Sequence, residues 1–221
     1  MKIELIDNDF IEIPNDRSVG IGFSGGVDST LLLWILLTYS TQTVYPMTIT
    51  VDNRHHRHKR VASEVLELCC KLTGNHNVIH CAIHCEDIDL DDPLHEPALK
   101  QNWFIKSGMI KQFFIGTNQL PPVGHLHTDD YKENHTVEFQ RRNPGQTKAT
   151  SSHGGIFQYP FINYDKRQIK YLYDKFGIPD EVYSKTWSCS GSISEDVWHN
   201  KKHCGKCGPC QERIYGFGKI E

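Results

Sequence analysis

SGGVDS, residues 24–29, is the stretch that decides the fold of this chain. It follows the apolar run VGIGF at 19–23 and precedes the helical run TLLLWILLTY at 30–39. The sequence therefore predicts a strand, a glycine turn and a helix N-terminus, which is an anion-binding arrangement. The stretch is not a Walker A loop, because that motif has the form GxxxxGK[ST] and no lysine occurs here.

The residue types within the stretch suit a phosphate. Gly25 and Gly26 have no Cβ, so an anion can approach the backbone and the N–H groups of the first helical turn. Ser24 and Ser29 add hydroxyl donors. The carboxylate of Asp28 would repel phosphate unless it caps the helix or holds a metal ion, and both interpretations stay open.

This stretch resembles the signature of the PP-loop ATP pyrophosphatases. The resemblance implies that ATP binds at residues 24–29, that a substrate oxygen attacks the α-phosphate, and that the loop holds the departing pyrophosphate. It also implies an α/β fold with an open, mainly parallel sheet and helices on both faces. The alternative is a glycine turn before an ordinary helix.

The composition excludes several classes of protein. The 221 residues include 24 basic and 27 acidic side chains, a formal charge of −3 that argues against a protein dedicated to wrapping nucleic acid. The chain has no run of 18 apolar residues and no apolar signal-peptide core, so we expect a cytoplasmic protein without a membrane partner. In that compartment the eight cysteines are expected to be reduced thiols and metal ligands.

The first half of the chain predicts a βαβ unit. Residues 3–13 alternate apolar and polar around a turn and predict a hairpin leading into the sheet. The β-branched run at 43–51 predicts the second strand, at an edge or a bulge because of Pro46. Apolar spacing predicts a helix at 61–72, closed by Gly74.

The chain from residue 78 to residue 118 predicts two more strands with a helix between them. Residues 78–83 predict a third strand, residues 98–112 a helix, and residues 113–115 a fourth strand. Gly116 and Asn118 come directly after this strand, where open parallel sheets place their ligands. We therefore expect both residues to contribute to nucleotide binding.

The region after residue 155 contains a further strand and helix. Residues 156–161 predict a short strand, and Asn163 or Asp165 is expected to cap a helix that ends at Phe176. The preceding stretch, residues 120–155, is too long for an ordinary connection and predicts either a substrate lid or a mobile insertion.

Two histidine-rich stretches do not predict metal sites. DNRHHRHKR at 52–60 has consecutive histidines that point in different directions, so a solvated basic loop that attracts ATP is favoured. In HCAIHC at 80–85, alternate residues of a strand face opposite sides and cannot converge.

Cysteine spacing at the C-terminal end predicts a metal site. Cys204, Cys207 and Cys210 follow one another at CxxC intervals, and Cys189 can supply a fourth thiolate. A closed tetrahedral sulfur site favours structural Zn²⁺. An iron–sulfur cluster, a redox CxxC pair, or replacement of one cysteine by His203 are the alternatives.

Both ends of the chain resemble the 7-cyano-7-deazaguanine synthase family. The residues that carry this resemblance are SGGVDS, GIPDEVYSKTWSC at 177–189 and CGKCGPCQER at 204–213. The resemblance implies a PP-loop domain over 1–183 and a zinc-binding region over 184–221. The middle departs from it, because NRHH replaces a glycine–glutamine–arginine–histidine segment and two prolines follow Gln119.

The implied reaction uses ATP, Mg²⁺ and ammonia. A carboxylate such as that of 7-carboxy-7-deazaguanine is adenylated, aminated to the amide, and dehydrated to the nitrile in a second ATP-dependent step. Asp28 is expected to hold Mg²⁺ or the loop, and Lys166 and Lys185 are candidates for phosphate contacts.

Three other functions stay open. The same activation chemistry can stop at the amide or join another amine, or a PP-loop enzyme can act on tRNA or another small molecule. The third alternative is a zinc-dependent nucleic-acid-binding module, although the charge balance predicts no stable nucleic-acid binding. A homodimer is compatible with the sequence.

Overall fold

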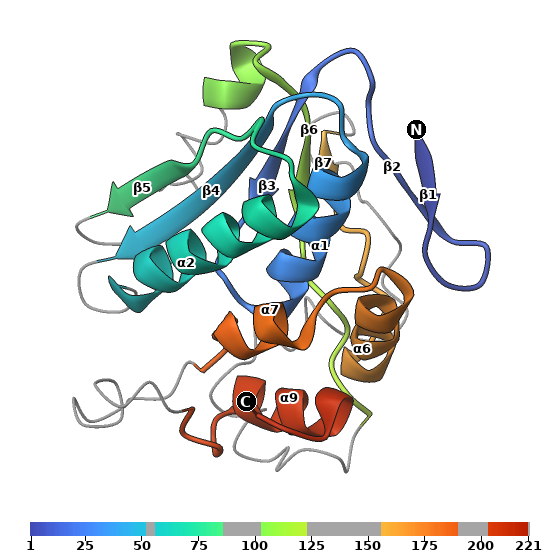
Figure 1. Cartoon of the computed structure of the whole chain (residues 1–221), viewed down its shortest axis with the longest axis vertical. Coiled ribbons are helices and arrows are strands. Elements are labelled where there is room, and N and C mark those ends of the chain that lie inside the picture. Colours follow the sequence, from blue (N-terminus) through green and yellow to red (C-terminus); the bar gives the residue numbers. More distant parts are fainter. Residues whose placement is uncertain (52–55, 86–102, 123–155, 190–202, 221) are drawn as a thin grey trace.

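A computed structural model describes residues 1–51, 56–85, 103–122, 156–189 and 203–220. Its centre is a five-stranded parallel sheet with the strand order β5-β4-β3-β6-β7 (Figure 1). The strands are β3 (Ser18–Gly22), β4 (Val44–Val51), β5 (Cys81–Cys85), β6 (Ile110–Ile115) and β7 (Phe157–Gln158). The prediction of an open, mainly parallel α/β sheet is confirmed.

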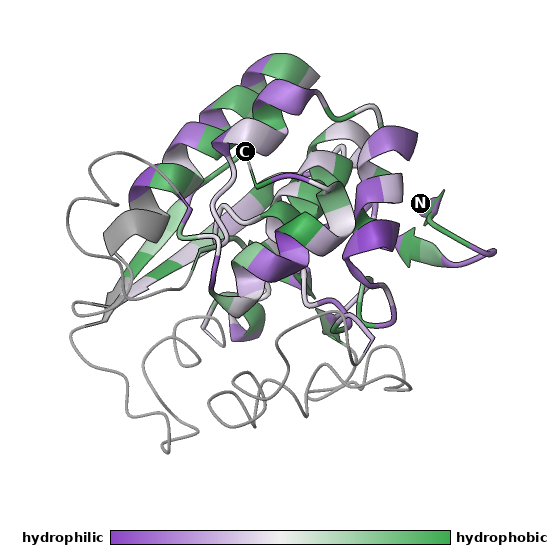
Figure 2. Ribbon diagram, turned by 90° about the horizontal axis from the view of Figure 1, so that it is seen from below, coloured by the Kyte–Doolittle hydropathy of each residue, from purple (hydrophilic) through white to green (hydrophobic). Residues whose placement is uncertain are grey.

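Two helices connect the first three strands of this sheet. Helix α1 (Val27–Tyr39) joins β3 to β4, and α2 (His56–Thr73) lies between β4 and β5 (Figure 1). The segment from Leu31 to Leu37 is buried throughout, so α1 is apolar on all sides and runs through the interior. Helices nearer the surface show bands of hydrophilic and hydrophobic residues (Figure 2).

Side-chain alternation along the strands gives the sheet a core on each face. Val19 and Ile21 of β3 pack with α1 and α2 in the larger cluster. Tyr45 and Met47 of β4 and Phe113 of β6 belong to a second cluster, which also includes partly buried residues of the helical turn at 103–106. Because successive strand residues face opposite ways, these clusters cover both faces of the sheet.

Pro46 lies inside the sheet, so the edge position, one of the two alternatives that the sequence predicted, is wrong. It pairs with Ile21 of β3, while β5 lies on the other side of β4. The β4–β5 ladder is interrupted beside Pro46, between an isolated bridge from Val44 to Val78 and the continuous pairing that starts at Met47. The missing N–H of proline therefore falls at a gap in the hydrogen bonding.

The N-terminal hairpin is correctly predicted, but it does not join the main sheet. Strands β1 (Lys2–Glu4) and β2 (Phe10–Glu12) form a separate antiparallel pair. The turn between them places Asp7 and Asn8 at φ values of 53° and 63°, a conformation that these two residue types tolerate well.

Several predicted boundaries are wrong. The third strand, predicted at 78–83, is β5 at Cys81–Cys85. Residues 103–106 are helical, but Gly108 takes a φ of 72° and β6 already begins at Ile110, so the predicted helix does not reach residue 112. The strand predicted at 156–161 has only two residues. Helix α2 starts at His56, so part of the predicted basic loop is helical.

Three helices at one end of the molecule complete the described fold: α6 (Lys166–Lys175), α7 (Asp180–Lys185) and α9 (Gly208–Phe217) (Figure 1). Asp165 caps α6 with a full capping box to Gln168, and the helix ends at the predicted position. Helix α9 packs on α6 so closely that a Cβ on Gly216 would lie 2.4 Å from the Lys166 carbonyl oxygen.

Some predictions fall on residues that are not described. They concern residues 52–55, the segment 86–102, and nearly all of the 120–155 stretch. Within the described ranges, none of the helices combines the length and apolar character that crossing a bilayer requires.

Candidate nucleotide and metal site

The 24–29 loop is held in shape by its own serine hydroxyls. The backbone N–H of Ser24 donates to Ser29 Oγ at 3.3 Å, and Ser29 Oγ donates to the Gly26 carbonyl at 3.1 Å. The N–H of Gly26 in turn donates to Ser24 Oγ at 3.3 Å. The predicted strand, turn and helix are present, and the first turn of α1 directs its backbone N–H groups toward the loop.

Close packing requires a glycine at position 25, whereas a Cβ at position 26 would lie at ordinary van der Waals distance from the 187–188 segment. Gly25 has a φ of 76°, and a Cβ there would lie 3.0 Å from the backbone nitrogen of Ala62 in α2. A Cβ on Gly26 would lie 3.5 Å from the Trp187 carbonyl oxygen and 3.6 Å from Ser188 Oγ. The loop thus lies between α2 and a segment near the C-terminus.

Asp28 does not cap helix α1. The N-cap position is Gly26, which makes no side-chain capping bond, and Asp28 lies in the first helical turn. Its Oδ2 accepts a hydrogen bond from Lys166 Nζ, whereas its Oδ1 is buried with no partner among the described residues. The capping interpretation is therefore wrong, and one carboxylate oxygen remains available to a cation.

Lys166 is a buried ammonium group surrounded by oxygen atoms. Its side chain is 5% exposed, and Nζ lies 3.3 Å from Asn118 Oδ1 and 3.7 Å from Glu212 Oε2, in addition to its contact with Asp28. The Lys166 ammonium thus contacts two carboxylates, those of Asp28 and Glu212. The structure thus brings together three predicted site residues, Asp28, Asn118 and Lys166, with Glu212 as a fourth member.

Gly116 allows the end of β6 to approach the loop. A Cβ at this position would lie 3.0 Å from the Asp28 carbonyl carbon and 3.0 Å from the Ser29 nitrogen. Any side chain here would push β6 away from the first turn of α1. Gly116 and Asn118 therefore lie at the loop, as their position after a strand predicted.

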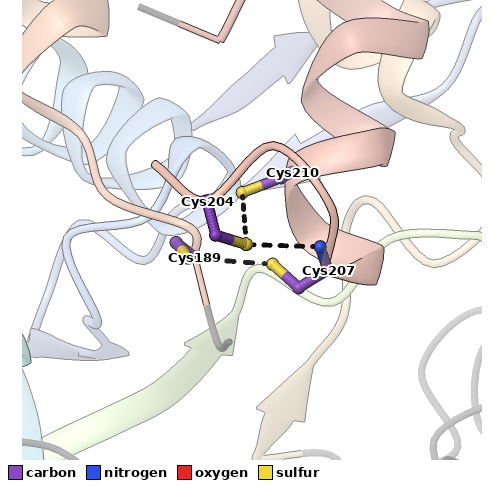
Figure 3. Close-up of side chains that lie close together, drawn as sticks. All are labelled: Cys189, Cys204, Cys207 and Cys210. Atoms are coloured by element: carbon purple, nitrogen blue, oxygen red, sulfur yellow. Dashed lines mark hydrogen bonds between the residues drawn. The ribbon is translucent and has the colours of Figure 1, made fainter. Parts of the chain in front are cut away.

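The four predicted cysteines converge. The sulfur atoms of Cys189, Cys204, Cys207 and Cys210 all lie within 4.8 Å of one another (Figure 3). Cys207 Sγ is 3.8 Å from Cys189 Sγ, and Cys204 Sγ is 3.9 Å from Cys210 Sγ. The backbone N–H of Cys207 donates to Cys204 Sγ at 3.3 Å, a contact that shapes the turn between them.

This four-cysteine group fits a metal ion. A tetrahedral ion with Zn–S bonds of about 2.3 Å requires sulfur atoms about 3.8 Å apart, close to the two distances above. Hydrogen bonding to Cys189 and Cys207 raises the pKa of the Cys210 thiol far above its ordinary range. A cation would have the opposite effect, since it binds and stabilises thiolates.

His203 is not part of the four-cysteine group. Its ring stacks on Trp187 with centroids 4.4 Å apart, and its Nε2 accepts a hydrogen bond from the Ser188 backbone at 3.4 Å. Burial lowers the pKa of His203 to about 4, so the ring is neutral at pH 7. The alternative in which His203 replaces a cysteine is not supported by this geometry.

Glu212 and Arg213 were not predicted as site residues, although both belong to the stretch 204–213 that carries the family resemblance. Arg213 is fully buried; it donates to Thr186 Oγ1 at 2.8 Å and to the Ile220 carbonyl at 2.9 Å, and it lies over the Tyr183 ring. Two adjacent charged residues, at the second and third positions after Cys210, were the available signal. Lys185, a predicted phosphate contact, is exposed at the end of α7.

Comparison with known families identifies the class of protein. The model of the PP-loop domain family matches residues 2–178, which include the 24–29 loop and all of the parallel sheet. The chain therefore belongs to the PP-loop family of ATP-utilising enzymes. The cysteine-bearing C-terminal region lies beyond the matched residues.

Curated relatives point to one branch of this family. The chain is 26% identical to a 7-cyano-7-deazaguanine synthase of Methanoregula boonei, over 88% of this chain and 91% of that protein. It is 24% identical to 7-cyano-7-deazaguanine synthase 1 of Colwellia psychrerythraea, over 91% of this chain and 94% of that protein. Each alignment covers most of this chain and most of the relative.

The solved structures that this chain resembles have a lower sequence identity to it than the curated relatives. One is the U34-tRNA thiolase NcsA from Methanococcus maripaludis with its [4Fe-4S] cluster, at 14% identity and a TM-score of 0.44 over 93% of this chain and 72% of that one. Another is the NMN synthetase from Francisella tularensis, at 16% identity and a TM-score of 0.36 over 93% of this chain and 85% of that one.

Proposed function

We propose that this protein converts a 7-deazaguanine carboxylate to 7-cyano-7-deazaguanine with ATP and ammonia. The observation that carries the proposal is the direct contact between the 24–29 loop and the segment that bears Cys189, through a 2.9 Å hydrogen bond from the Trp187 N–H to the Gly25 carbonyl. Two relatives named 7-cyano-7-deazaguanine synthase, similar to about nine tenths of this chain, support the proposal.

The chemistry begins with activation of the acid. A carboxylate oxygen attacks the α-phosphorus of ATP, the bond to the β-phosphate oxygen breaks, and pyrophosphate leaves. Ammonia then attacks the acyl carbon, AMP leaves with the bonding electron pair, and loss of a proton gives the amide. In a second cycle the amide oxygen attacks another ATP, and departure of AMP with loss of two protons gives the nitrile.

The 24–29 loop assists by stabilising the leaving group. The N–H groups of the α1 first turn and the Ser24 hydroxyl are the proposed donors to the pyrophosphate, where negative charge develops, while the Ser29 hydroxyl donates to the Gly26 carbonyl and shapes the loop. Because the loop is braced internally, these donors need little rearrangement when the nucleotide binds.

Asp28 and Lys166 are proposed as the charged residues of the reaction. The unpartnered Oδ1 of Asp28 suits Mg²⁺, which prefers carboxylate oxygens and accompanies the phosphates of ATP. Lys166 holds the other carboxylate oxygen and fixes the orientation of the group. Asn118 restrains the Lys166 ammonium from the β6 side.

The four-cysteine group is proposed to hold Zn²⁺. The sulfur separations suit a single tetrahedral ion better than an iron–sulfur cluster, which would place its own iron and sulfide atoms between the thiolates. A closed set of four thiolates leaves no open coordination position for a substrate. We therefore assign the ion a structural role.

The test is to incubate the protein with ATP, Mg²⁺, ammonium and 7-carboxy-7-deazaguanine and to measure pyrophosphate and product mass. The proposal predicts the nitrile, with two pyrophosphates released for each molecule formed. Accumulation of the amide or of a conjugate would instead support the chemistry that stops early. No release of pyrophosphate with this acid would overturn the substrate assignment.

A pair of matched variants tests the role of Asp28. Asp28→Asn keeps the size of the side chain but removes its charge, and we expect loss of most Mg²⁺-dependent pyrophosphate release. Asp16→Asn is the control, because Asp16 is an exposed carboxylate that pairs with Lys111 at 3.0 Å and precedes β3, whereas the loop follows β3. Equal activity of the two variants would exclude Asp28 from the reaction.

A further inference from the structure

The four-cysteine group and the 24–29 loop are linked by three separate sets of contacts. The shortest runs through the backbone: Trp187, two residues before Cys189, donates its N–H to the Gly25 carbonyl at 2.9 Å. The Trp187 side chain packs against Cys189 and Cys210 in one apolar cluster. The position of this residue therefore depends on both the cysteines and the loop.

A second link passes through α2. Val61 packs against the cluster formed by Trp187, Cys189 and Cys210. The same side chain borders the loop, since a Cβ on Gly25 would lie 3.0 Å from Val61 Cγ1. One valine therefore contacts both sites.

The third link passes through α9, which begins within the four-cysteine group. Cys210 lies in its first turn, and Glu212 follows two residues later, 3.7 Å from Lys166 Nζ. Lys166 in turn contacts Asp28 in the loop. One turn further along, Gly216 packs directly on Lys166, so α9 cannot shift without moving this lysine.

Arg213 joins these links into one unit. Its Nη1 donates to Thr186 Oγ1 at 2.8 Å, and it also lies 3.5 Å from Ser188 Oγ. Thr186 and Ser188 flank Trp187, so the arginine holds α9 and the segment that touches the loop together. Any movement of the cysteine-bearing turn is expected to reach both Trp187 and Lys166.

We propose that the metal ion at the four cysteines controls nucleotide binding at the 24–29 loop. This inference rests on the proposed function, since it requires ATP at the loop and Zn²⁺ at the cysteines. The ligands come from two separate chain segments, and metal binding supplies free energy that holds such segments together. Without the ion, the cysteine-bearing segments are no longer held together, and we expect Trp187 and Glu212 to be held less firmly beside Gly25 and Lys166.

The same coupling must operate in both directions. If zinc raises the affinity for the nucleotide by a given factor, the nucleotide raises the affinity for zinc by that factor. Couplings between two sites in proteins are typically on the order of 5- to 150-fold. We expect an effect of at least about fivefold here, because three sets of contacts join the sites.

The first experiment measures equilibrium binding of an ATP analogue with an α,β-methylene bridge, in Mg²⁺, by calorimetry. The affinity of the zinc-loaded full chain is compared with that of the zinc-free full chain. The zinc-free sample is prepared with a chelator, which is then removed by dialysis. We expect at least about fivefold weaker binding to the zinc-free protein. Cys207→Ser should behave like the zinc-free protein, whereas Cys81→Ser, outside the group, should behave like the wild type.

The second experiment uses the loaded wild-type chain and does not depend on folding of the zinc-free form. Zinc transfer to a chromogenic chelator is followed at equilibrium with and without the analogue, and the analogue should increase zinc retention by the same factor. Equal retention in both conditions would overturn the coupling while leaving the proposed function intact. Failure of the loaded protein to bind the analogue would overturn both.

Discussion

Replacing Lys166 by methionine removes the ammonium group between the 24–29 loop and helix α9 while keeping a similar side-chain length. The Lys166 side chain is 5% exposed, and the carboxylates of Asp28 and Glu212 that face it are 21% and 1% exposed. The substitution removes the ammonium that contacts both carboxylates at a largely buried position. We expect this variant to fold less stably and to lose ATP-dependent activity.

The size of the effect follows from the burial of these groups. Removing one member of a buried ion pair typically costs about 3–5 kcal/mol, because the remaining charge stays desolvated. Asp28 retains some contact with solvent, so we expect a loss near the lower end, about 3 kcal/mol. Adding Glu212→Gln removes the more deeply buried carboxylate and should restore roughly half of that loss.

Urea unfolding of the zinc-loaded protein measures this prediction. Lys111→Met is the matched control, because Lys111 pairs with Asp16 at 3.0 Å but both side chains are about half exposed. Such a surface pair is expected to contribute about 0–1 kcal/mol. If Lys166→Met were no more destabilising than Lys111→Met, the buried charge group would not have the role assigned to it.

Three further predictions concern packing, metal binding and pH. Gly216→Ala places a Cβ against the Lys166 backbone and should destabilise the protein by about 1–3 kcal/mol in the same unfolding assay. Cys207→Ser should reduce the zinc content measured by atomic spectroscopy, whereas Cys81→Ser should not, because Cys81 lies outside the four-cysteine group. Burial raises the pKa of the Cys69 thiol from 9.0 to about 12, so the folded state retains a proton that the unfolded state loses. The contribution of Cys69 to the free energy of unfolding is therefore fully present below pH 9.0 and is lost as the pH rises toward 12. In this range the free energy of unfolding falls by up to about 1.4 kcal/mol per pH unit. Cys69→Val should show a weaker dependence of the unfolding free energy on pH in this range.

Local sequence signals predicted much of the fold. The SGGVDS stretch, the apolar run of α1 and the Asp165 cap each specify their element by short-range chemistry, and each lies where it was expected. Pro46 was misplaced because strand order depends on pairing between distant segments. The local rule that proline avoids interior strands could not reveal a matching gap in the β4–β5 ladder.

The candidate site was only partly predictable for the same reason. CxxC spacing predicted that Cys204, Cys207 and Cys210 converge, because this spacing is typical of metal ligands, and Cys189 was the candidate fourth ligand. The partnership of Lys166 with Asp28 and Glu212 joins residues from three helices that are far apart in the sequence. No periodicity or local motif encodes such a contact, and it became visible only from the packing of α9 on α6.

The most direct test of the central claim follows an oxygen atom during ATP cleavage. The carboxylic acid substrate is labelled with ¹⁸O in its carboxylate and incubated with the protein, ATP, Mg²⁺ and ammonium. The masses of the nucleotide products are then measured by mass spectrometry. Attack of the carboxylate on the α-phosphorus predicts pyrophosphate and AMP that carries one ¹⁸O atom from the acid. Release of ADP and inorganic phosphate, or AMP without the label, would contradict the account.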